Sequence, residues 1–213
     1  MAISTTINTH CPSCNAARSS LIVCDDCRSL FPVPPTATYF DLLAIPTSFG
    51  LDDAALLAAY RSLTRRIHPD RFGGAGDDVG DLATRLSAQI NEAYSVLSKP
   101  VRRADYMLTL AGGPSAAEVR DVPGNLLEEV MTLREEIDQA CDDGDTEAIA
   151  RHRDAITQRK QLALEQLANH ADRLDTCDED ERAGFRKRLN SIKYFDNLLT
   201  RLTTDPLAEA DHR

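Results

Sequence analysis

The fold of this chain is decided by residues 52–72, which read DDAALLAAYRSLTRRIHPDRF. Apolar side chains recur there at i, i+4, i+7 and i+11, and this period predicts an amphipathic helix from about 52 to 67. Its buried face is expected to hold Leu56, Tyr60, Leu63 and Ile67. The two leading aspartates suit the positive N-terminal end of a helix. Pro69 cannot continue the helix, so we expect the chain to turn at this point.

Helical segments flank this turn on both sides. A glycine-rich stretch over 73–80 predicts a loop, and a second amphipathic helix is predicted over about 81–97. Its inward residues are expected to be Leu82, Leu86, Ile90, Ala93 and Leu97. Pro100 at a helix start opens a further helix, and residues 39–43 predict a short helical turn. We therefore expect residues 38–112 to form one domain around an antiparallel helical hairpin.

Residues 113–213 predict a second domain that is wholly helical. Their apolar periodicity indicates three helices, at about 124–141, 145–170 and 179–204. In the first of these helices, one stripe at helical spacing is assigned to the core, namely Leu126, Val130, Leu133 and Ile137. We expect the three helices to form an antiparallel bundle around such stripes.

Four of the six cysteines lie in two close pairs near the N-terminus, with the spacing C-x2-C-x9-C-x2-C. A two-residue gap lets both sulfurs of a pair face one point, so two such knuckles supply four thiolates for a tetrahedral structural zinc. The predicted zinc ligands are Cys11, Cys14, Cys24 and Cys27. Residues 1–37, which end in a proline-rich linker, cannot bury a large core, so a metal cross-link is the expected source of order. Two disulfides or a thioredoxin-type redox pair are the alternatives, whereas Cys141 and Cys177 are interpreted as packed thiols.

Composition and charge narrow the class of protein. The predicted fold class is mainly α, with a helical hairpin, a C-terminal three-helix bundle and a small N-terminal zinc-knuckle module. The net charge of −10 lies mostly in the C-terminal half and disfavours a nucleic-acid partner. A basic island interrupts this acidity at Arg61, Arg65, Arg66 and Arg71. No apolar run is long enough to span a membrane, and no secretion signal is seen, so we expect a cytoplasmic protein without a membrane partner.

Three segments of the first helical domain resemble the J-domain family of co-chaperones, namely YFDLL at 39–43, RIHPDRF at 66–72 and INEAY at 90–94. Two more are similar to the specialised HscB type of that family, namely PVRRADYML at 100–108 and LREE at 133–136. The resemblance implies a co-chaperone of iron–sulfur cluster assembly that is not itself an enzyme. The cysteine module is similar to that of the eukaryotic members and some others, and a eukaryotic chain would be expected in the mitochondrial matrix.

The resemblance also implies a mechanism at the turn. In this family the tripeptide loop docks on an ATPase chaperone of the HscA or DnaK type and stabilises the state that hydrolyses ATP, while a positive helix face meets an acidic chaperone surface. The chaperone-binding residues that it implies are His68, Pro69, Asp70, Arg61, Arg65 and Arg66. In physical terms, Pro69 fixes the turn and the Asp70 carboxylate offers an acceptor to a cationic partner group.

The C-terminal bundle has more apolar residues than one buried face per helix requires. Leu127 and Met131 form a second stripe about 100° from the core stripe, because each residue turns a helix by that angle. On the last helix, Tyr194 and Leu198 point away from the main apolar side. Such a surplus indicates either a wider core or a protein-binding surface. HscB-type bundles bind the iron–sulfur scaffold IscU, which implies as scaffold-binding residues Leu127, Met131, Glu135, Lys193 and Tyr194.

Three other functions are compatible with the sequence. A general J-protein would use the same turn for a different client. A zinc-dependent redox protein would use the cysteine pairs, and thiol titration would separate it from a structural zinc protein. A zinc-ribbon nucleic-acid binder is the third, and the overall acidity disfavours it.

Overall fold

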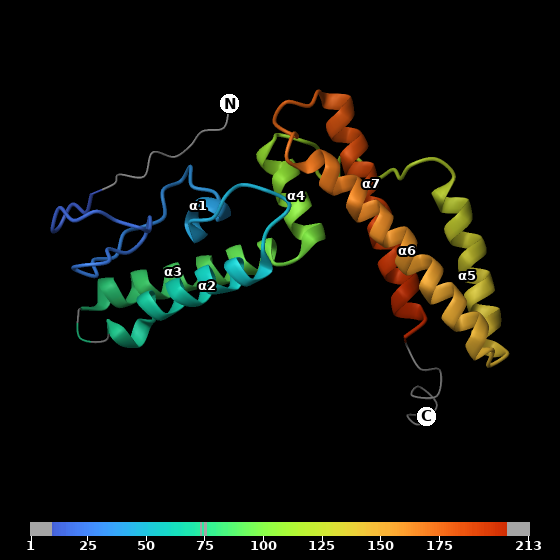
Figure 1. The fold of residues 1–213 in the computed structure, drawn as a ribbon, viewed down its shortest axis with the longest axis horizontal. Coiled ribbons are helices and arrows are strands. Elements are labelled where there is room, and N and C mark those ends of the chain that lie inside the picture. Colours follow the sequence, from blue (N-terminus) through green and yellow to red (C-terminus); the bar gives the residue numbers. More distant parts are fainter. Residues whose placement is uncertain (1–9, 73, 75, 204–213) are drawn as a thin grey trace. The chain divides into compact units, whose positions relative to one another are not determined.

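The structure is a computed structural model, and it describes residues 10–72, 74 and 76–203. Over this part the chain is mainly α, as predicted, with isolated β-bridges but no strand (Figure 1). None of the described helices has the length and apolar character that a bilayer crossing requires. The elements in chain order are α1 Tyr39–Leu43, α2 Asp53–Ile67, the 3-10 turn η1 Pro69–Arg71, α3 Asp77–Leu97, α4 Pro100–Leu110, α5 Leu126–Asp142, α6 Thr146–Ala171 and α7 Glu179–Arg201.

The chain divides into two compact units, Met1–Arg103 and Ala104–Arg213. The division falls inside α4 rather than after 112, because the C-terminal half of α4 is tied to α7. The buried Arg186 of α7 forms an ion pair with Asp105 and donates from Nε to the Pro114 carbonyl at 2.9 Å. A buried guanidinium needs such partners, since leaving its donors unpaired is costly. The predicted domain boundaries at residues 37 and 112 stay predictions.

In the first unit, α2 and α3 pack side by side as an antiparallel hairpin (Figure 1). The Asp52 side chain caps α2 by accepting from the Ala54 amide at 2.9 Å. Three of the four residues expected on the inner face of α2 are buried. Tyr60 is half-buried instead: its ring stacks on Tyr94 with centroids 4.2 Å apart, and its hydroxyl donates to Asn91 at 3.0 Å. The Tyr60 side chain therefore packs at the edge of the interface between α2 and α3 and not at its centre.

Helix α3 begins at Asp77, earlier than the predicted start near 81. Asp77 and Asp78 lie in its first turn, where carboxylates favour the positive end of a helix. This stabilisation extends the helix through Gly80, so the connecting loop is shorter than the predicted 73–80. At its other end α3 is followed by α4, and the chain leaves α4 through Gly112, whose φ of +71° suits glycine.

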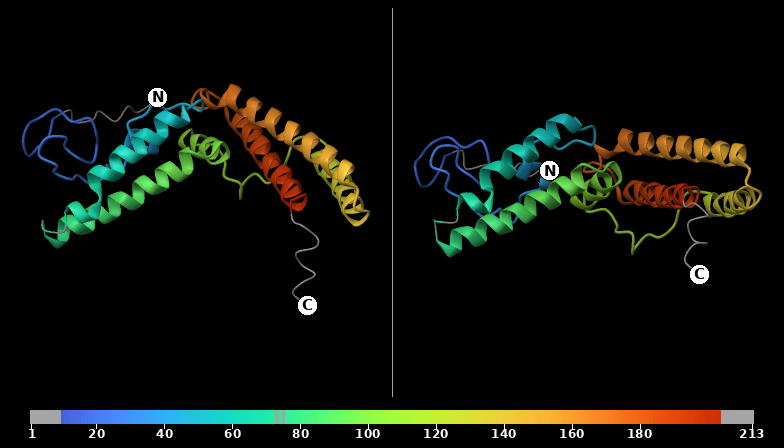
Figure 2. Two further views of the ribbon diagram at one scale, coloured as in Figure 1. Left: turned by 60° about the horizontal axis from the view of Figure 1, so that its bottom comes forward. Right: turned by 90° about the horizontal axis from the view of Figure 1, so that it is seen from below.

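In the second unit, α6 packs against both α5 and α7 (Figure 2). The core of this bundle is formed by Ile137, Ile156, Phe195, Leu198 and Leu202. The stripe predicted for the first bundle helix is confirmed as core, because Ile137 is fully buried and its other three members pack against the same cluster. The sequence placed Leu198 outside the main apolar side of α7, and this was wrong. Leu198 is only 3% exposed, because α7 contacts α5 as well as α6 and buries a wider face.

Candidate functional site

The His68-Pro69-Asp70 turn is held rigidly and faces solvent. His68 ends α2 and Pro69 begins η1, in which the Phe72 amide donates to the Pro69 carbonyl at 2.8 Å. Phe72 is buried and anchors the C-terminal side of the turn. The Asp70 amide donates to His68 Nδ1 at 3.4 Å, yet the Asp70 side chain is 87% exposed. The turn therefore presents an accessible carboxylate on a hydrogen-bonded backbone, the condition on which the predicted docking mechanism depends.

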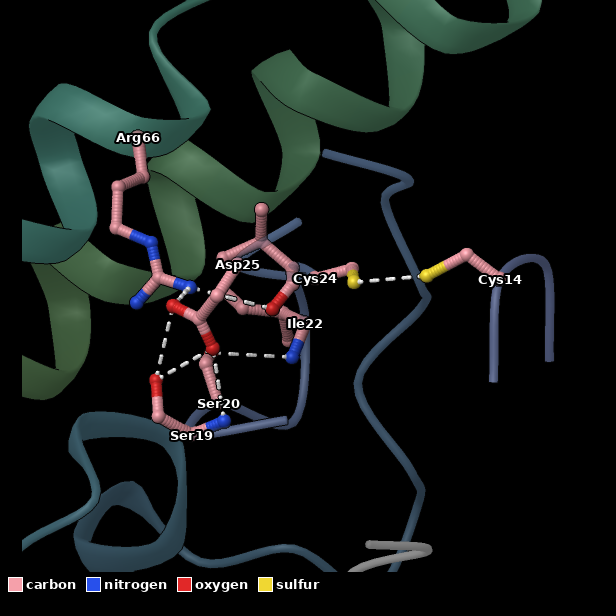
Figure 3. A network of polar contacts seen from close by, with 8 residues as sticks. Cys14, Ser19, Ser20, Ile22, Cys24, Asp25 and Arg66 are labelled. Carbon is pink, nitrogen blue, oxygen red and sulfur yellow. Dashed lines mark hydrogen bonds and ion pairs between the residues drawn. The ribbon is translucent and has the colours of Figure 1, made fainter. Parts of the chain in front are cut away.

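The basic residues of α2 do not form a uniform face. Arg61 and Arg65, four residues apart on one side of the helix, are exposed. Arg66 is half-buried and turns toward the cysteine module, where its Nη2 lies 2.6 Å from Asp25 Oδ1 and 3.3 Å from the Val23 carbonyl (Figure 3). Arg61 and Arg65 are therefore free to meet a partner, whereas Arg66 already has an intramolecular partner.

The two cysteine pairs lie in matching knuckles. In the first, the Cys11 amide donates to the Ala16 carbonyl at 2.8 Å, and in the second the Cys24 amide donates to the Ser29 carbonyl at 3.0 Å. The residue after each pair, Asn15 or Arg28, has a left-handed φ of 59° or 60° that closes the turn. Each knuckle is thus a tight local turn in which the two cysteine sulfurs face the same point.

The four predicted ligands converge on one point. Their Sγ atoms all lie within 4.8 Å of one another, with 3.5 Å between Cys11 and Cys27 and 3.6 Å between Cys14 and Cys24. Zinc–sulfur bonds of about 2.3 Å in a tetrahedron place the sulfurs about 3.8 Å apart, so these residues fit a zinc ion. All four are free cysteines in the structure, which does not support the alternative of two disulfides.

The thiols of the cluster perturb one another. Hydrogen bonds from the Ser29 hydroxyl and amide lower the pKa of Cys27 to about 6. The Ala16 backbone lowers the pKa of Cys14, but the neighbouring thiols and burial outweigh it and raise this pKa to about 12. Thiolates this close repel one another, so they ionise unequally, and a divalent cation at their centre removes that repulsion.

We expect metal removal to unfold the cysteine module and leave the helical units folded. Binding of zinc by four thiolates supplies about 10–16 kcal/mol in comparable small modules, more than a short core provides. Thiol titration checks this. The half-buried Cys141 and Cys177 should react without a chelator, whereas the four cluster thiols should react only after a chelator is added. Cys141→Ser is the matched control and should remove only one thiol that reacts before chelation. Equal reaction of all six thiols before chelation would contradict a metal site.

A second candidate site lies on the bundle, between α5 and α7. Leu127 and Met131, at 50% and 65% exposed, line a groove of about 470 Å³ together with Tyr194 and with Leu198 at its floor. Two arginines, Arg134 and Arg201, also line it. Glu135 and Lys193 are exposed but lie outside its lining. Large apolar side chains exposed beside charged ones are typical of a protein-binding surface.

Sequence reasoning missed the contact between the cysteine module and α2. Asp25 and Arg66 are separated by 41 residues, and no local periodicity connects them. The available signal was the charge of each segment: a loop with two aspartates between Cys24 and Cys27, and a helix end with two adjacent arginines.

Two family models match the chain. Residues 38–106 match the DnaJ domain, and residues 122–203 match the HSCB C-terminal oligomerisation domain. These ranges contain the turn at 68–70 and the groove between α5 and α7. The cysteine module precedes both.

Named relatives and solved structures agree with these matches. A Co-chaperone protein HscB homolog of Burkholderia multivorans is 36% identical over 137 residues, which is 63% of this chain and 78% of the relative. One of Vibrio cholerae is 39% identical over 115 residues, or 53% of this chain and 67% of the relative. The structure of chaperone HscB from Vibrio cholerae has a TM-score of 0.67 at 29% identity, covering 82% of this chain and 99% of its own. Human co-chaperone protein HscB shares the fold, with a TM-score of 0.74 at 24% identity over 95% of this chain and 99% of its own.

Proposed function

This chain belongs to the HscB family of co-chaperones, and we propose that it stimulates ATP hydrolysis by an HscA- or DnaK-type chaperone and delivers an IscU-type iron–sulfur scaffold to it. The observation that carries the proposal is the exposed Asp70 carboxylate on a rigid turn at the end of a basic helix. The apolar groove of the bundle supplies a second, separate binding surface. A protein with two such surfaces can bring two partners together.

The turn would act on the chaperone by docking, with no bond made or broken in this chain. Pro69 and the buried Phe72 hold the turn, so little conformational entropy is lost when it binds. The Asp70 carboxylate would accept charge-assisted hydrogen bonds from a cationic group of the chaperone. Arg61 and Arg65, both exposed, would attract an acidic chaperone surface and mainly raise the association rate. Hydrolysis itself would take place in the chaperone.

The groove would bind the scaffold through its apolar residues. Leu127, Met131 and Tyr194 supply apolar and aromatic contact area, which dominates binding energy at the centre of an interface. The exposed charges of Glu135 and Lys193 would lie at the rim and fix the orientation of the partner. The iron–sulfur cluster would be cargo carried by the scaffold and not by this chain.

The cysteine module would hold structural zinc. Cys11, Cys14, Cys24 and Cys27 fill all four positions of a tetrahedron, so no position is left for a substrate. The metal would cross-link the two knuckles. We place the protein in the cytoplasm, or in the mitochondrial matrix for a eukaryotic source.

The test is chaperone ATPase turnover measured with the chaperone alone, with this chain, with the scaffold, and with both. We expect this chain to raise turnover by about tenfold, a lowering of the barrier by about 1.4 kcal/mol, and the scaffold to raise it further. A different result would indicate a general J-protein with another client. In that case the chain would stimulate turnover, but the scaffold would add nothing and would not bind at micromolar concentration.

A further inference from the structure

We propose that metal binding by the cysteine module and attachment of the module to α2 are coupled through the ion pair of Asp25 and Arg66. The pair joins a loop between two metal ligands to the helix that ends at the His68-Pro69-Asp70 turn. Both partners lie in the same compact unit. The coupling concerns residues of this chain alone, and it is independent of which chaperone or scaffold binds.

Arg66 contacts both neighbours of one metal ligand. Its Nη2 donates to the Val23 carbonyl at 3.3 Å and to Asp25 Oδ1 at 2.6 Å, and these residues directly precede and follow Cys24 (Figure 3). The guanidinium therefore bridges two acceptors that belong to the residues before and after Cys24. A change in the backbone conformation at Cys24 would change the spacing of these acceptors and weaken the bridge.

The Asp25 carboxylate is held from the opposite side by Ser19. The Ser19 amide donates to Oδ2 at 2.9 Å, and its hydroxyl donates to the same oxygen at 2.8 Å. These hydrogen bonds fix the carboxylate in the orientation in which it accepts from Arg66 (Figure 3). The side chains of Arg66 and Asp25 are 25% and 39% exposed, so solvent screens the pair only in part.

The metal is what would keep Cys24 in place. Within its own knuckle, the Cys24 amide bonds to the Ser29 carbonyl, and its sulfur is one of the four that a metal would join across the two knuckles. A bound ion that fixes Cys24 also fixes Val23 and Asp25 in the positions that Arg66 recognises. Linkage between the two events is reciprocal: the factor by which bound metal strengthens the contact of Arg66 with the module is also the factor by which this contact raises the affinity for the metal.

The coupling has a consequence for the basic helix face, and this consequence rests on the proposed function. While the module is loaded, Arg66 is neutralised by Asp25, and of the three α2 arginines only Arg61 and Arg65 face a chaperone. Loss of the metal would release a third guanidinium two residues before His68. Metal occupancy would thereby set the charge that α2 presents.

Competition for Zn²⁺ against a colorimetric chelator tests the coupling without any chaperone, so failure of the proposed function leaves the result intact. We expect Arg66→Gln to lower Zn²⁺ affinity by about threefold to tenfold, because the bridge to the loaded module is lost. Arg65→Gln, an exposed arginine one position earlier, is the matched control and should change the affinity by less than about twofold.

A double-mutant cycle assigns the effect to the pair. Asp26→Asn removes the same charge as Asp25→Asn from the same loop, and it controls for the direct attraction between a carboxylate and the metal. Arg66→Gln should weaken Zn²⁺ binding in the Asp26→Asn background but not in the Asp25→Asn background. Equal affinities of Arg66→Gln and Arg65→Gln, or additive effects of Arg66→Gln and Asp25→Asn, would overturn the proposal. Circular dichroism before the titration shows that each variant is folded.

Discussion

Replacement of Asp70 with asparagine should abolish stimulation of the chaperone's ATPase while the chain keeps its fold. The Asp70 side chain is 87% exposed, and the turn is held by backbone bonds and by the buried Phe72, so the fold does not depend on the carboxylate. Asparagine keeps the shape of the side chain but lacks its charge. A hydrogen bond to a charged group contributes about 1.5–3 kcal/mol, so its loss should weaken chaperone engagement by about ten- to a hundredfold.

Steady-state turnover over a range of co-chaperone concentrations measures this effect. Asp53→Asn is the matched control, because Asp53 is an exposed aspartate in the first turn of α2, at the end of that helix opposite to the His68-Pro69-Asp70 turn. It should stimulate like the unmodified chain, and the thermal unfolding midpoints of both variants should stay close to that of the parent. Stimulation by Asp70→Asn at the same concentrations as the parent would remove the docking mechanism, since Asp70 is the acidic residue among positions 68–72.

Local sequence signals were sufficient where one helix face decides the structure. The apolar period of 52–67 located α2, and the pair spacing of the cysteines located four sulfurs that do converge. The predicted start of α3 is too late because the low helix propensity of the glycines in 73–80 favours a loop there. The two aspartates at 77 and 78 stabilise the first helical turn and outweigh this preference. In such cases two local signals compete, and their relative size cannot be judged from the pattern alone.

Other features depend on contacts between distant segments. Leu198 is buried because α7 contacts two helices at once, and periodicity along α7 carries no information about how many neighbours it has. Arg66 resembled Arg61 and Arg65 in the sequence, and the structure separates them only because Asp25 of another segment lies beside it. Leu127 and Met131 could be identified as surplus apolar residues, but that they share a groove with Tyr194 required the packing of α5 on α7.

Scaffold binding should be lost when both exposed apolar residues of the groove are replaced by aspartate. Leu127 and Met131 are 50% and 65% exposed, so Leu127→Asp with Met131→Asp should cost the fold little. Burial of each side chain in an interface contributes about 1.5–3 kcal/mol, and the new carboxylates would have to be desolvated there. We expect the affinity for an IscU-type scaffold to fall by at least about a hundredfold, measured by isothermal titration calorimetry.

Leu162→Asp is the matched control for this experiment, because Leu162 is an equally exposed leucine, at 55%, on α6 of the same bundle. It adds one carboxylate to the same domain outside the groove, where the double variant adds two inside it, so it should bind the scaffold like the parent chain. The double variant should still stimulate the chaperone in the absence of scaffold, because the turn at 68–70 is unchanged. Binding of the scaffold by the double variant within about threefold of the parent affinity would place the scaffold site elsewhere, since the apolar contact area of Leu127 and Met131 would then contribute little to binding.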